Sequence, residues 1–385
     1  MDGTSAEHKH RKYRFLTRVK HVVLWPFKLV KRFWKQGLWQ KIVVLLCSLV
    51  LLFVATVMGV AQWYINTNDH QPLRLGATFI PSYAEDLGLN PEETMDTLIN
   101  ELGVKHFRLV SYWNELEPAQ DQYDFSRLDW QFRKAEAADA TVSLALGLRQ
   151  PRWPECHWPQ WAQELNGQGG PSVGQWQEQL EQFIAQVVNR YKSSPALSSY
   201  QLENEYFLKV FSPECIDYSR DRLVSEFNLV KQLDPFHPVI LARSNNYGVP
   251  LGDPIPDIYG FSVYRRVWDG KTNRYFQYPL PPKWYAFHAG LQQIIHGKPS
   301  LLHELQAEAW PPNGQSIQNV SLEEQNKSIN AERLEDTFQF GIDAGFREIY
   351  LWGAEYWLYR KDKLGDPSLW DVAKEEFRTL EGTHE

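Results

Sequence analysis

Short apolar segments alternate with helical ones eight times along most of the chain. Apolar residues three or four positions apart predict helices in most of the intervals, and Asn90, followed by Pro91 and Glu92, is a typical helix start. Eight such repeats over about 300 residues predict a (β/α)8 TIM barrel, an α/β fold, in preference to an open doubly wound sheet. The interval between the fifth and sixth segments is short, so we expect its helix to be missing or degenerate. The segments that we expect to be strands are residues 73–80, 105–111, 141–147, 195–202, 238–242, 257–264, 299–304 and 348–353.

A segment of twenty uncharged residues, 42–61, precedes this pattern. It is long enough for about 30 Å of helix, the thickness of one bilayer core. The alternative to a signal anchor is a cleaved signal peptide. The length of the apolar run, the length of the region before it and the lack of a clear small-residue cleavage site favour the anchor.

Charge is divided unevenly on the two sides of this segment. Residues 1–41 carry 11 Lys and Arg against two Asp and Glu, whereas the remainder carries 29 against 45. This bias places the N-terminus in the cytoplasm and the rest outside it, at the cell membrane. The basic, aromatic tail either lies on the anionic inner leaflet or serves only as a topogenic charge cluster.

These features predict four parts of the chain. We expect a basic cytoplasmic tail over residues 1–41, a transmembrane signal anchor over 42–62, a linker over 63–71 and the barrel over 72–385. The lipid bilayer is thus the expected partner of the apolar segment. The acidic barrel argues against nucleic acid as a partner.

Polar residues appear abruptly where two of the expected strands end. Asn204 and Glu205 follow the fourth strand, and Glu304 ends the seventh. Burying such groups is costly unless they bind something, and the active site of a (β/α)8 barrel lies at the carboxyl ends of its strands. One protonated and one ionised carboxyl group are what cleavage of a glycosidic bond requires. Surface carboxylates in loops are the alternative.

Further side chains at the strand ends complete a coherent site. A cation at Arg108 would keep a nearby carboxylate ionised, and Tyr264 would donate a hydrogen bond to it. Asn204 is a candidate for holding a sugar hydroxyl group. Tryptophan rings stack on the apolar faces of sugars. We expect two or three of the loop tryptophans to stack on sugars and the others to pack in the protein. These loop residues are Trp153, Trp158, Trp268, Trp310 and Trp357, and a further tryptophan, Trp352, ends the eighth strand.

Over residues 73–359 the chain resembles the clan A glycoside hydrolases, which are retaining (β/α)8 enzymes. The resemblance implies that Glu205 is the acid/base, Glu304 the nucleophile and Asn204 a contact to the 2-hydroxyl group of the sugar. The segment from Gln201 to Tyr206 is similar to the acid/base motif of β-galactosidase-type families. Three further positions match the clan's strand-two arginine, strand-six aromatic and strand-eight tryptophan, namely Arg108, Tyr264 and Trp352.

Several other polar residues near the strand ends have two interpretations. Glu203 is expected to pair with Arg108 or a lysine in preference to a catalytic role. His303 is expected to face the barrel wall as a core histidine. Glu308 and Glu355 either bind sugar hydroxyl groups or are solvated loop acids. His and Cys spacing does not suggest a zinc site, and we expect no metal and no cofactor.

The chain has three cysteines. Cys156 and Cys215 fall in the loops after strands three and four, which are neighbours on one face of a barrel. An extracytoplasmic location would be oxidising, so we expect a disulfide bond between them; two free buried thiols are the alternative. Cys47 lies in the apolar segment and should remain unpaired.

These observations predict a membrane-anchored, retaining β-glycosidase or transglycosidase. Its expected partner is an extracytoplasmic oligosaccharide, polysaccharide or glycoconjugate substrate, cleaved by double displacement. A non-catalytic carbohydrate-binding barrel is the alternative from another class, and a membrane scaffold is a third. The presence of both Glu205 and Glu304 favours the enzyme, because a binding relic tends to lose one of the two.

Overall fold

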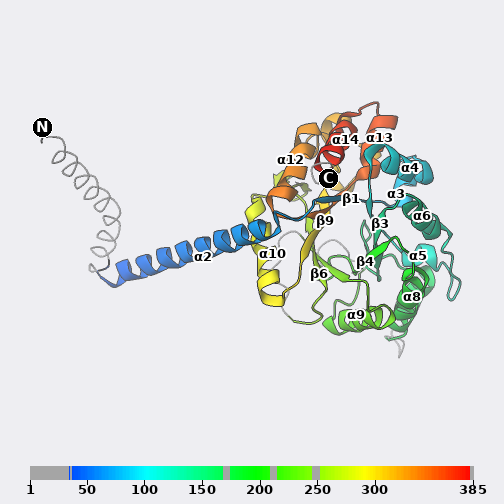
Figure 1. Ribbon diagram of the computed structural model, residues 1–385, viewed down its shortest axis with the longest axis horizontal. Coiled ribbons are helices and arrows are strands. Elements are labelled where there is room, and N and C mark those ends of the chain that lie inside the picture. Colours follow the sequence, from blue (N-terminus) through cyan, green and yellow to red (C-terminus); the bar gives the residue numbers. More distant parts are fainter. Residues whose placement is uncertain (1–33, 35–36, 168–173, 209–214, 245–251, 382–385) are drawn as a thin grey trace, which may run out of the picture. The chain divides into compact units, whose positions relative to one another are not determined.

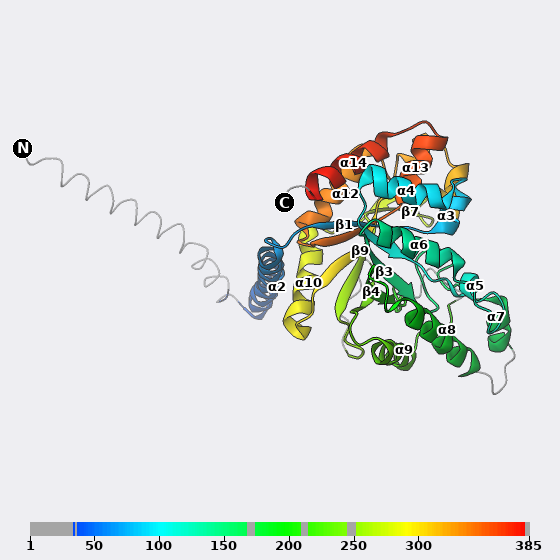
Figure 2. The same ribbon diagram turned by 45° about the vertical axis from the view of Figure 1, so that its right-hand side comes forward.

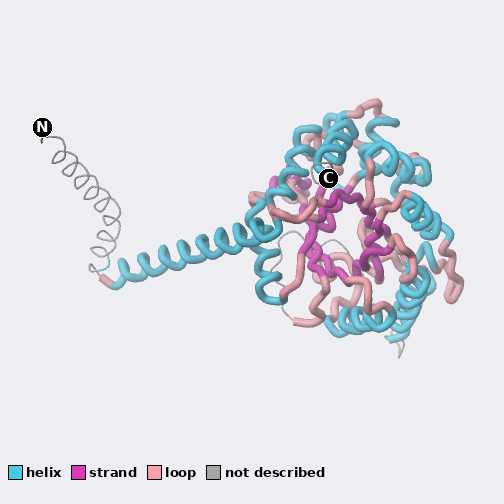
Figure 3. The backbone as a smooth tube through the Cα atoms, viewed as in Figure 1, coloured by secondary structure: helices cyan, strands magenta, loops and turns pink. Residues whose placement is uncertain are grey.

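The computed structural model describes residues 34, 37–167, 174–208, 215–244 and 252–381. Eight parallel strands close into a barrel, and Figure 3 shows them as a ring enclosed by helices. The barrel predicted from the sequence is thus confirmed. In their order around the ring the strands are β1 (Arg74–Thr78), β10 (Glu348–Trp352), β9 (Ser300–Gln306), β6 (Ile258–Val263), β5 (Val239–Arg243), β4 (Leu197–Leu202), β3 (Thr141–Leu146) and β2 (His106–Leu109).

Helices surround the ring, and Figures 1 and 2 show α8 and α9 lying side by side next to β4. The described residues between β5 and β6 contain no helix, and residues 245–251 lie outside the description. The helices of this unit are α3 (Pro81–Asp86), α4 (Pro91–Leu102), α5 (Trp113–Leu116), α6 (Ser126–Ala137), α7 (Gln160–Gly167), α8 (Gln175–Tyr191), α9 (Arg220–Leu233), α10 (Pro282–His296), α11 (Leu322–Gln325), α12 (Ala331–Asp343), α13 (Ala354–Lys363) and α14 (Ser368–Glu381).

Local sequence explains where these elements begin and end. Asn90 caps α4 by accepting hydrogen bonds from the backbone of Glu92 and Glu93 at 3.0 and 3.2 Å. Gly103 ends the same helix in the left-handed conformation, with φ of 77°. The loop after β6 folds into an antiparallel hairpin of β7 (Arg266–Asp269) and β8 (Arg274–Gln277), which was not expected from the sequence.

The N-terminal region contains one long apolar helix, α2 (Leu38–Asn68). Its 31 residues, of mean hydropathy 2.9 over the most apolar stretch, make it long and apolar enough to cross a membrane. The basic tail expected over residues 1–41 lies mostly outside the described residues. The chain divides into two compact units, residues 1–59 and 60–385, so the last turns of α2 belong to the barrel unit.

Those last turns are packed and do not form the linker expected over residues 63–71. Tyr64 is buried, with its ring 6.0 Å from that of Phe346, and Arg347 donates a hydrogen bond to the carbonyl oxygen of Asn68 at 3.1 Å. The polar residues that suggested a linker instead bond back along the helix, as Thr67 does to the carbonyl oxygen of Trp63. Helical structure therefore continues through Asn68.

Candidate active site

β9 contains one residue more than its neighbours near its carboxyl end. Phe261 on β6 pairs with Leu302, whereas the next residue, Ser262, pairs with Glu304. The register with β10 shifts at the same place. A bulge of this kind re-aims side chains, and the adjacent His303 and Glu304 both meet residues inside the barrel.

His303 is a buried core histidine. Its Nε2 lies 2.9 Å from Oγ of Ser143 on β3. Burial and the charge of Arg108 hold the pKa of the ring well below its usual range, so the ring is neutral at physiological pH. The expected direction, toward the barrel wall, was wrong because the bulge breaks the simple alternation of the strand.

Arg108, at the end of β2, organises the polar centre of the barrel. Its fully buried guanidinium group donates to Glu304 at 2.6 Å, to Gln201 at 2.7 Å and to Asn204 at 3.0 Å. The hydroxyl group of Tyr264 donates to the other oxygen of Glu304. Both oxygens of Glu304 therefore receive hydrogen bonds, one from a cation, and these stabilise negative charge on this carboxyl group.

The turn after β4 places Glu205 at the same centre. Glu203 and Glu205 have φ of 51° and 44°, a left-handed conformation that is uncommon for residues with a side chain. The backbone N–H of Asn204 donates to the carbonyl oxygen of Arg149 at 2.6 Å, and that of Leu208 donates to the carbonyl oxygen of Glu205 at 2.8 Å. The strained turn is thus held by hydrogen bonds on both sides of Glu205.

Glu205 has the opposite electrostatic setting to Glu304. Burial, followed by the charges of Glu304 and Glu155, raises the pKa of Glu205 to about 8. The hydroxyl group of Ser262 and the charge of Arg149 oppose this shift. Within the described residues, Oε1 of Glu205 is buried and has no hydrogen-bond partner. Glu205 is therefore protonated at neutral pH and can donate a proton to a bound group.

Trp352 ends β10 with one face of its ring already covered. The guanidinium group of Arg152 lies 4.5 Å from the centre of this ring and 3.3 Å from that of Tyr83. Arg152 also pairs with Glu308 at 3.1 Å, and the indole N–H of Trp352 donates to Glu308 at 2.8 Å. A sugar that stacks on Trp352 must use its other face or displace Arg152.

Glu308 and Glu355 are both held by protein partners. Glu355 is buried and accepts a hydrogen bond from the backbone of Ile80 at 2.5 Å; burial raises the pKa of Glu355 to about 7. Neither acid is a solvated loop residue, the alternative that the sequence left open.

The loop tryptophans divide between packing and exposure. Trp158 and Trp357 are buried and serve packing. Trp310 lies edge-on to Tyr264, with ring centres 5.4 Å apart, whereas Trp268 packs on Tyr275 in the hairpin. Trp153 is 68% exposed. Trp310 is therefore next to the polar centre through Tyr264, and Trp153 is free to meet a ligand from solvent.

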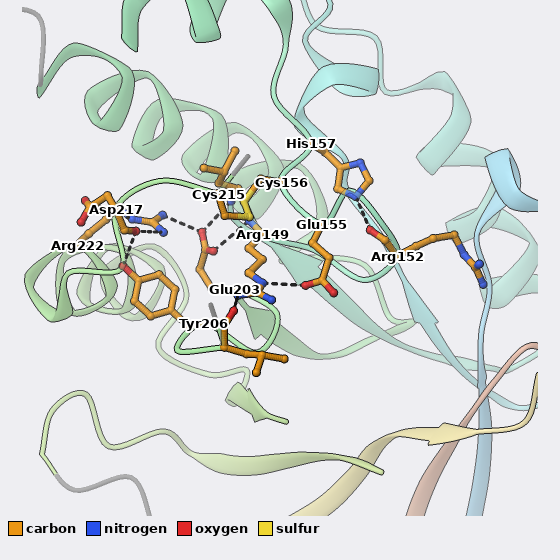
Figure 4. The surroundings of a disulfide bond; sticks show 12 residues. Arg149, Arg152, Glu155, Cys156, His157, Glu203, Tyr206, Cys215, Asp217 and Arg222 are labelled. Atoms are coloured by element: carbon orange, nitrogen blue, oxygen red, sulfur yellow. Dashed lines mark hydrogen bonds and ion pairs between the residues drawn. A yellow bond between two sulfur atoms is a disulfide. The ribbon is translucent and has the colours of Figure 1, made fainter. Parts of the chain in front are cut away.

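A disulfide bond joins the loops after β3 and β4. The Cα atoms of Cys156 and Cys215 are 5.3 Å apart, and Figure 4 shows the bond among buried charged residues. Glu203 lies in the same cluster, where it accepts hydrogen bonds from the backbone of Arg149 and from Arg222 at 3.0 Å each. Its expected pairing with Arg108 or a lysine was wrong, because the left-handed turn directs it toward α9.

Thiol titration tests this bond. The unfolded, unreduced chain should show one reactive thiol, from Cys47, and three after reduction. The Cys156→Ser/Cys215→Ser variant should lose about 2–4 kcal/mol in the free energy of unfolding. Cys47→Ser is the matched control and should leave that quantity unchanged. Three thiols without reductant would contradict the pairing.

Three charged residues of this region were missed in the sequence: Arg149, Arg152 and Glu155. Arg152 and Glu155 have φ of 80° and 67° in an irregular loop, where no periodic pattern marks a residue. Gln201 was also missed as a site residue, although it lies two positions after Ser199 on the inward face of β4 and period-two reasoning could have found it.

Comparison with known proteins agrees with this geometry. A family model described as beta-galactosidase matches residues 90–236, a region that contains Arg108, Asn204 and Glu205. No curated protein matches the chain. Among solved structures, the chain is similar to the β-galactosidase of Rahnella sp. R3, with a TM-score of 0.54 and 13% identity over 81% of this chain and 56% of that one.

Two further structures have the same fold. A GH5_18 protein from Streptomyces cattleya, in complex with GlcNAc, has a TM-score of 0.55 and 14% identity over 80% of this chain and 81% of that one. The β-galactosidase of Halorubrum lacusprofundi has a TM-score of 0.54 and 15% identity, over 80% and 59%. The chain therefore shares the (β/α)8 barrel fold of these proteins, and its residues 90–236 match the β-galactosidase family model.

The chain spans less than two thirds of the length of the β-galactosidases that it resembles. It spans 56% of the Rahnella protein and 59% of the Halorubrum protein. The likeness to all three structures is in the barrel fold. The region matched by the family model ends before Glu304, which the structure nonetheless brings to Arg108 and Tyr264.

Proposed function

We propose that this protein is a membrane-anchored, retaining β-glycosidase or transglycosidase acting on extracytoplasmic glycans. Glu304 attacks the anomeric carbon, and Glu205 protonates the leaving oxygen. Glu205 then takes a proton from the acceptor, either water or the hydroxyl group of another sugar, that releases the glycosyl unit. The contrast between the two carboxyl groups carries this proposal: Glu304 receives hydrogen bonds from Arg108 and Tyr264, whereas burial keeps Glu205 protonated.

The surrounding side chains support the same roles. Asn204 is held by Arg108 and Gln201, at 3.0 and 2.8 Å, in a position to meet a sugar hydroxyl group beside Glu205. The partly exposed Trp310 and the exposed Trp153 are candidates for sugar platforms. The family model makes β-galactosides the first substrates to test, followed by other nitrophenyl β-glycosides.

Activity should decline at alkaline pH. Protonated Glu205 is needed for the first step, and its pKa is about 8. We therefore expect kcat/KM to level off below pH 8 and to fall about tenfold per pH unit well above it, because the ionised fraction then dominates. The measurement is a pH profile of kcat/KM, with circular dichroism to show that the protein stays folded. A profile flat to pH 10 in folded protein would contradict the role of Glu205.

The location follows from α2 and from the charge bias before it. We propose that residues 1–41 are cytoplasmic, that residues 42–62 cross the bilayer and that the barrel is extracytoplasmic. The disulfide bond supports this, since such bonds persist in oxidising compartments.

Protease added to intact cells or spheroplasts tests the topology. The barrel should be digested and an epitope in residues 1–41 spared, because the bilayer shields only the cytoplasmic side. Detergent lysis, as the control, should expose both. Protection of the barrel in intact cells would contradict the topology, and a mature N-terminus near Tyr64 would show cleavage in place of anchoring.

A further inference from the structure

A third carboxyl group, that of Glu155, belongs to the surroundings of Glu205. Glu155 lies in the loop after β3, and its side chain is 15% exposed. Burial raises the pKa of this carboxyl group, and the ion pair with Arg149, whose Nε donates to it at 2.8 Å, opposes that rise and favours the ionised form. The clan A mechanism proposed above uses two carboxyl groups and gives Glu155 no part.

Arg149 connects Glu155 to the turn that carries Glu205. The carbonyl oxygen of Arg149 accepts a hydrogen bond from Asn204, which precedes Glu205. Its fully buried guanidinium group donates to the carbonyl oxygen of Leu208, which in turn donates its N–H to the carbonyl oxygen of Glu205. One arginine thus fixes the position of Glu155 relative to both sides of this turn.

The disulfide bond fixes the same loop from its other end. Cys156 directly follows Glu155, pairs with Arg149 in a short antiparallel bridge and is bonded to Cys215 in the loop after β4. Glu203 accepts the backbone N–H of Arg149, so the loop is tied to β4 as well (Figure 4). Glu155 is therefore a charge held in place by an arginine and a covalent bond.

The groups that face Glu205 come from several elements. β9 contributes Glu304, which is paired with Arg108 of β2. The loop after β3 contributes Glu155 and Arg149, and Ser262 on β6 contributes a neutral hydroxyl group. Of these charges, Glu304 and Glu155 favour the protonated form of Glu205, whereas Arg149 favours the ionised form.

We propose that Glu155 is a positioning residue for the acid/base Glu205. Its fixed negative charge keeps Glu205 protonated, and the bond between Cys156 and Cys215 keeps that charge in place. The proposal rests on the glycosidase function proposed above. Its consequence is that the alkaline limit of activity depends on a residue outside the catalytic pair and on an intact disulfide bond.

The test is the pH profile of kcat/KM for the full-length chain in detergent micelles, with a nitrophenyl β-glycoside that the wild type cleaves. Glu155→Gln keeps the shape of the side chain and removes the charge. We expect its alkaline limb to move to lower pH by about one unit, while activity at lower pH is retained. Glu164→Gln, which removes an exposed carboxyl group on α7, is the matched control and should leave the alkaline limb of the pH profile unchanged. An unmoved limb in folded Glu155→Gln would overturn the proposal.

Reduction of the disulfide bond gives a second measurement, which also serves if Glu155→Gln does not fold. Reduced wild type that remains folded should show its alkaline limb moved to lower pH. In Glu155→Gln, reduction should cause no further movement, because the charge that the bond holds is already gone. The proposed link between the disulfide bond and Glu155 would be contradicted if reduction left the alkaline limb of the wild type unchanged, or if it moved the limb equally in the wild type and in Glu155→Gln.

Failure of the proposed function is distinguishable from failure of this inference. Turnover that survives Glu304→Gln would refute the catalytic roles, whatever the limb does. If Glu304→Gln is inactive and the alkaline limb of the Glu155→Gln pH profile does not move, the glycosidase function is supported and the role of Glu155 is refuted.

Discussion

Glu304→Gln should abolish turnover of every glycoside that the wild type cleaves, with a loss of about 10⁴-fold or more in kcat. The amide of glutamine cannot act as the nucleophile that forms the glycosyl-enzyme. The substitution also removes the negative charge that Arg108 and Tyr264 stabilise. Initial rates on nitrophenyl glycosides, measured with the full-length chain in micelles, give the result.

The control for this variant is another buried carboxyl group. Glu117 is buried, accepts hydrogen bonds from the indole of Trp113 and the backbone of Asp121, and lies outside the proposed machinery. Glu117→Gln should keep turnover. Activity of folded Glu304→Gln within tenfold of the wild type would show that Glu304 is not the nucleophile.

Glu205→Ala should separate the two steps of the reaction. With a good leaving group, such as dinitrophenol, the first step needs no acid and should survive. The second step loses its general base and should slow by roughly 10²–10⁴-fold. Azide needs no base and can occupy the space left by the side chain, so it should restore turnover and yield the β-glycosyl azide.

The configuration of the azide product decides the assignment. An α-glycosyl azide, or rescue of Glu304→Ala in place of Glu205→Ala, would mean that the roles are reversed or the mechanism is different. A binding barrel without activity would give no turnover in the wild type and no azide product in either variant.

The sequence predicted the barrel and the residues at its strand ends for a physical reason. The carboxyl ends of parallel strands meet on one face of a closed barrel. Residues far apart in the chain, such as Arg108, Glu205 and Glu304, could therefore be placed together from strand positions alone. The expected contacts of Arg108 and Tyr264 with Glu304 follow from this rule.

What could not be predicted depends on local irregularity. The bulge in β9 turns His303 inward, and a bulge is set by pairing with two neighbouring strands and not by the residue itself. Glu155 and Arg152 adopt left-handed conformations in a loop without periodicity, so their contacts with Arg149 and Trp352 had no signal in the sequence.

The end of α2 shows a second reason why part of the structure could not be predicted from the sequence. Its polar residues suggested a linker, since polar residues of this kind are common between domains. Tertiary contacts reversed that expectation: Tyr64 is buried against Phe346, and Gly345 leaves space for Ile65, because a Cβ atom there would lie 3.0 Å from Ile65. A fragment that begins at Gln71 would lack these contacts, so the tests above use the full chain.

Trapping of the glycosyl-enzyme tests the central claim most directly. A 2-deoxy-2-fluoro β-glycoside with a good leaving group should form a covalent adduct that accumulates, because the fluorine slows its hydrolysis. Digestion and mass spectrometry of the labelled peptide should then locate the sugar on Glu304. A sugar on Glu205, or turnover that proceeds without any adduct and releases the α-anomer first, would contradict a retaining mechanism with Glu304 as its nucleophile.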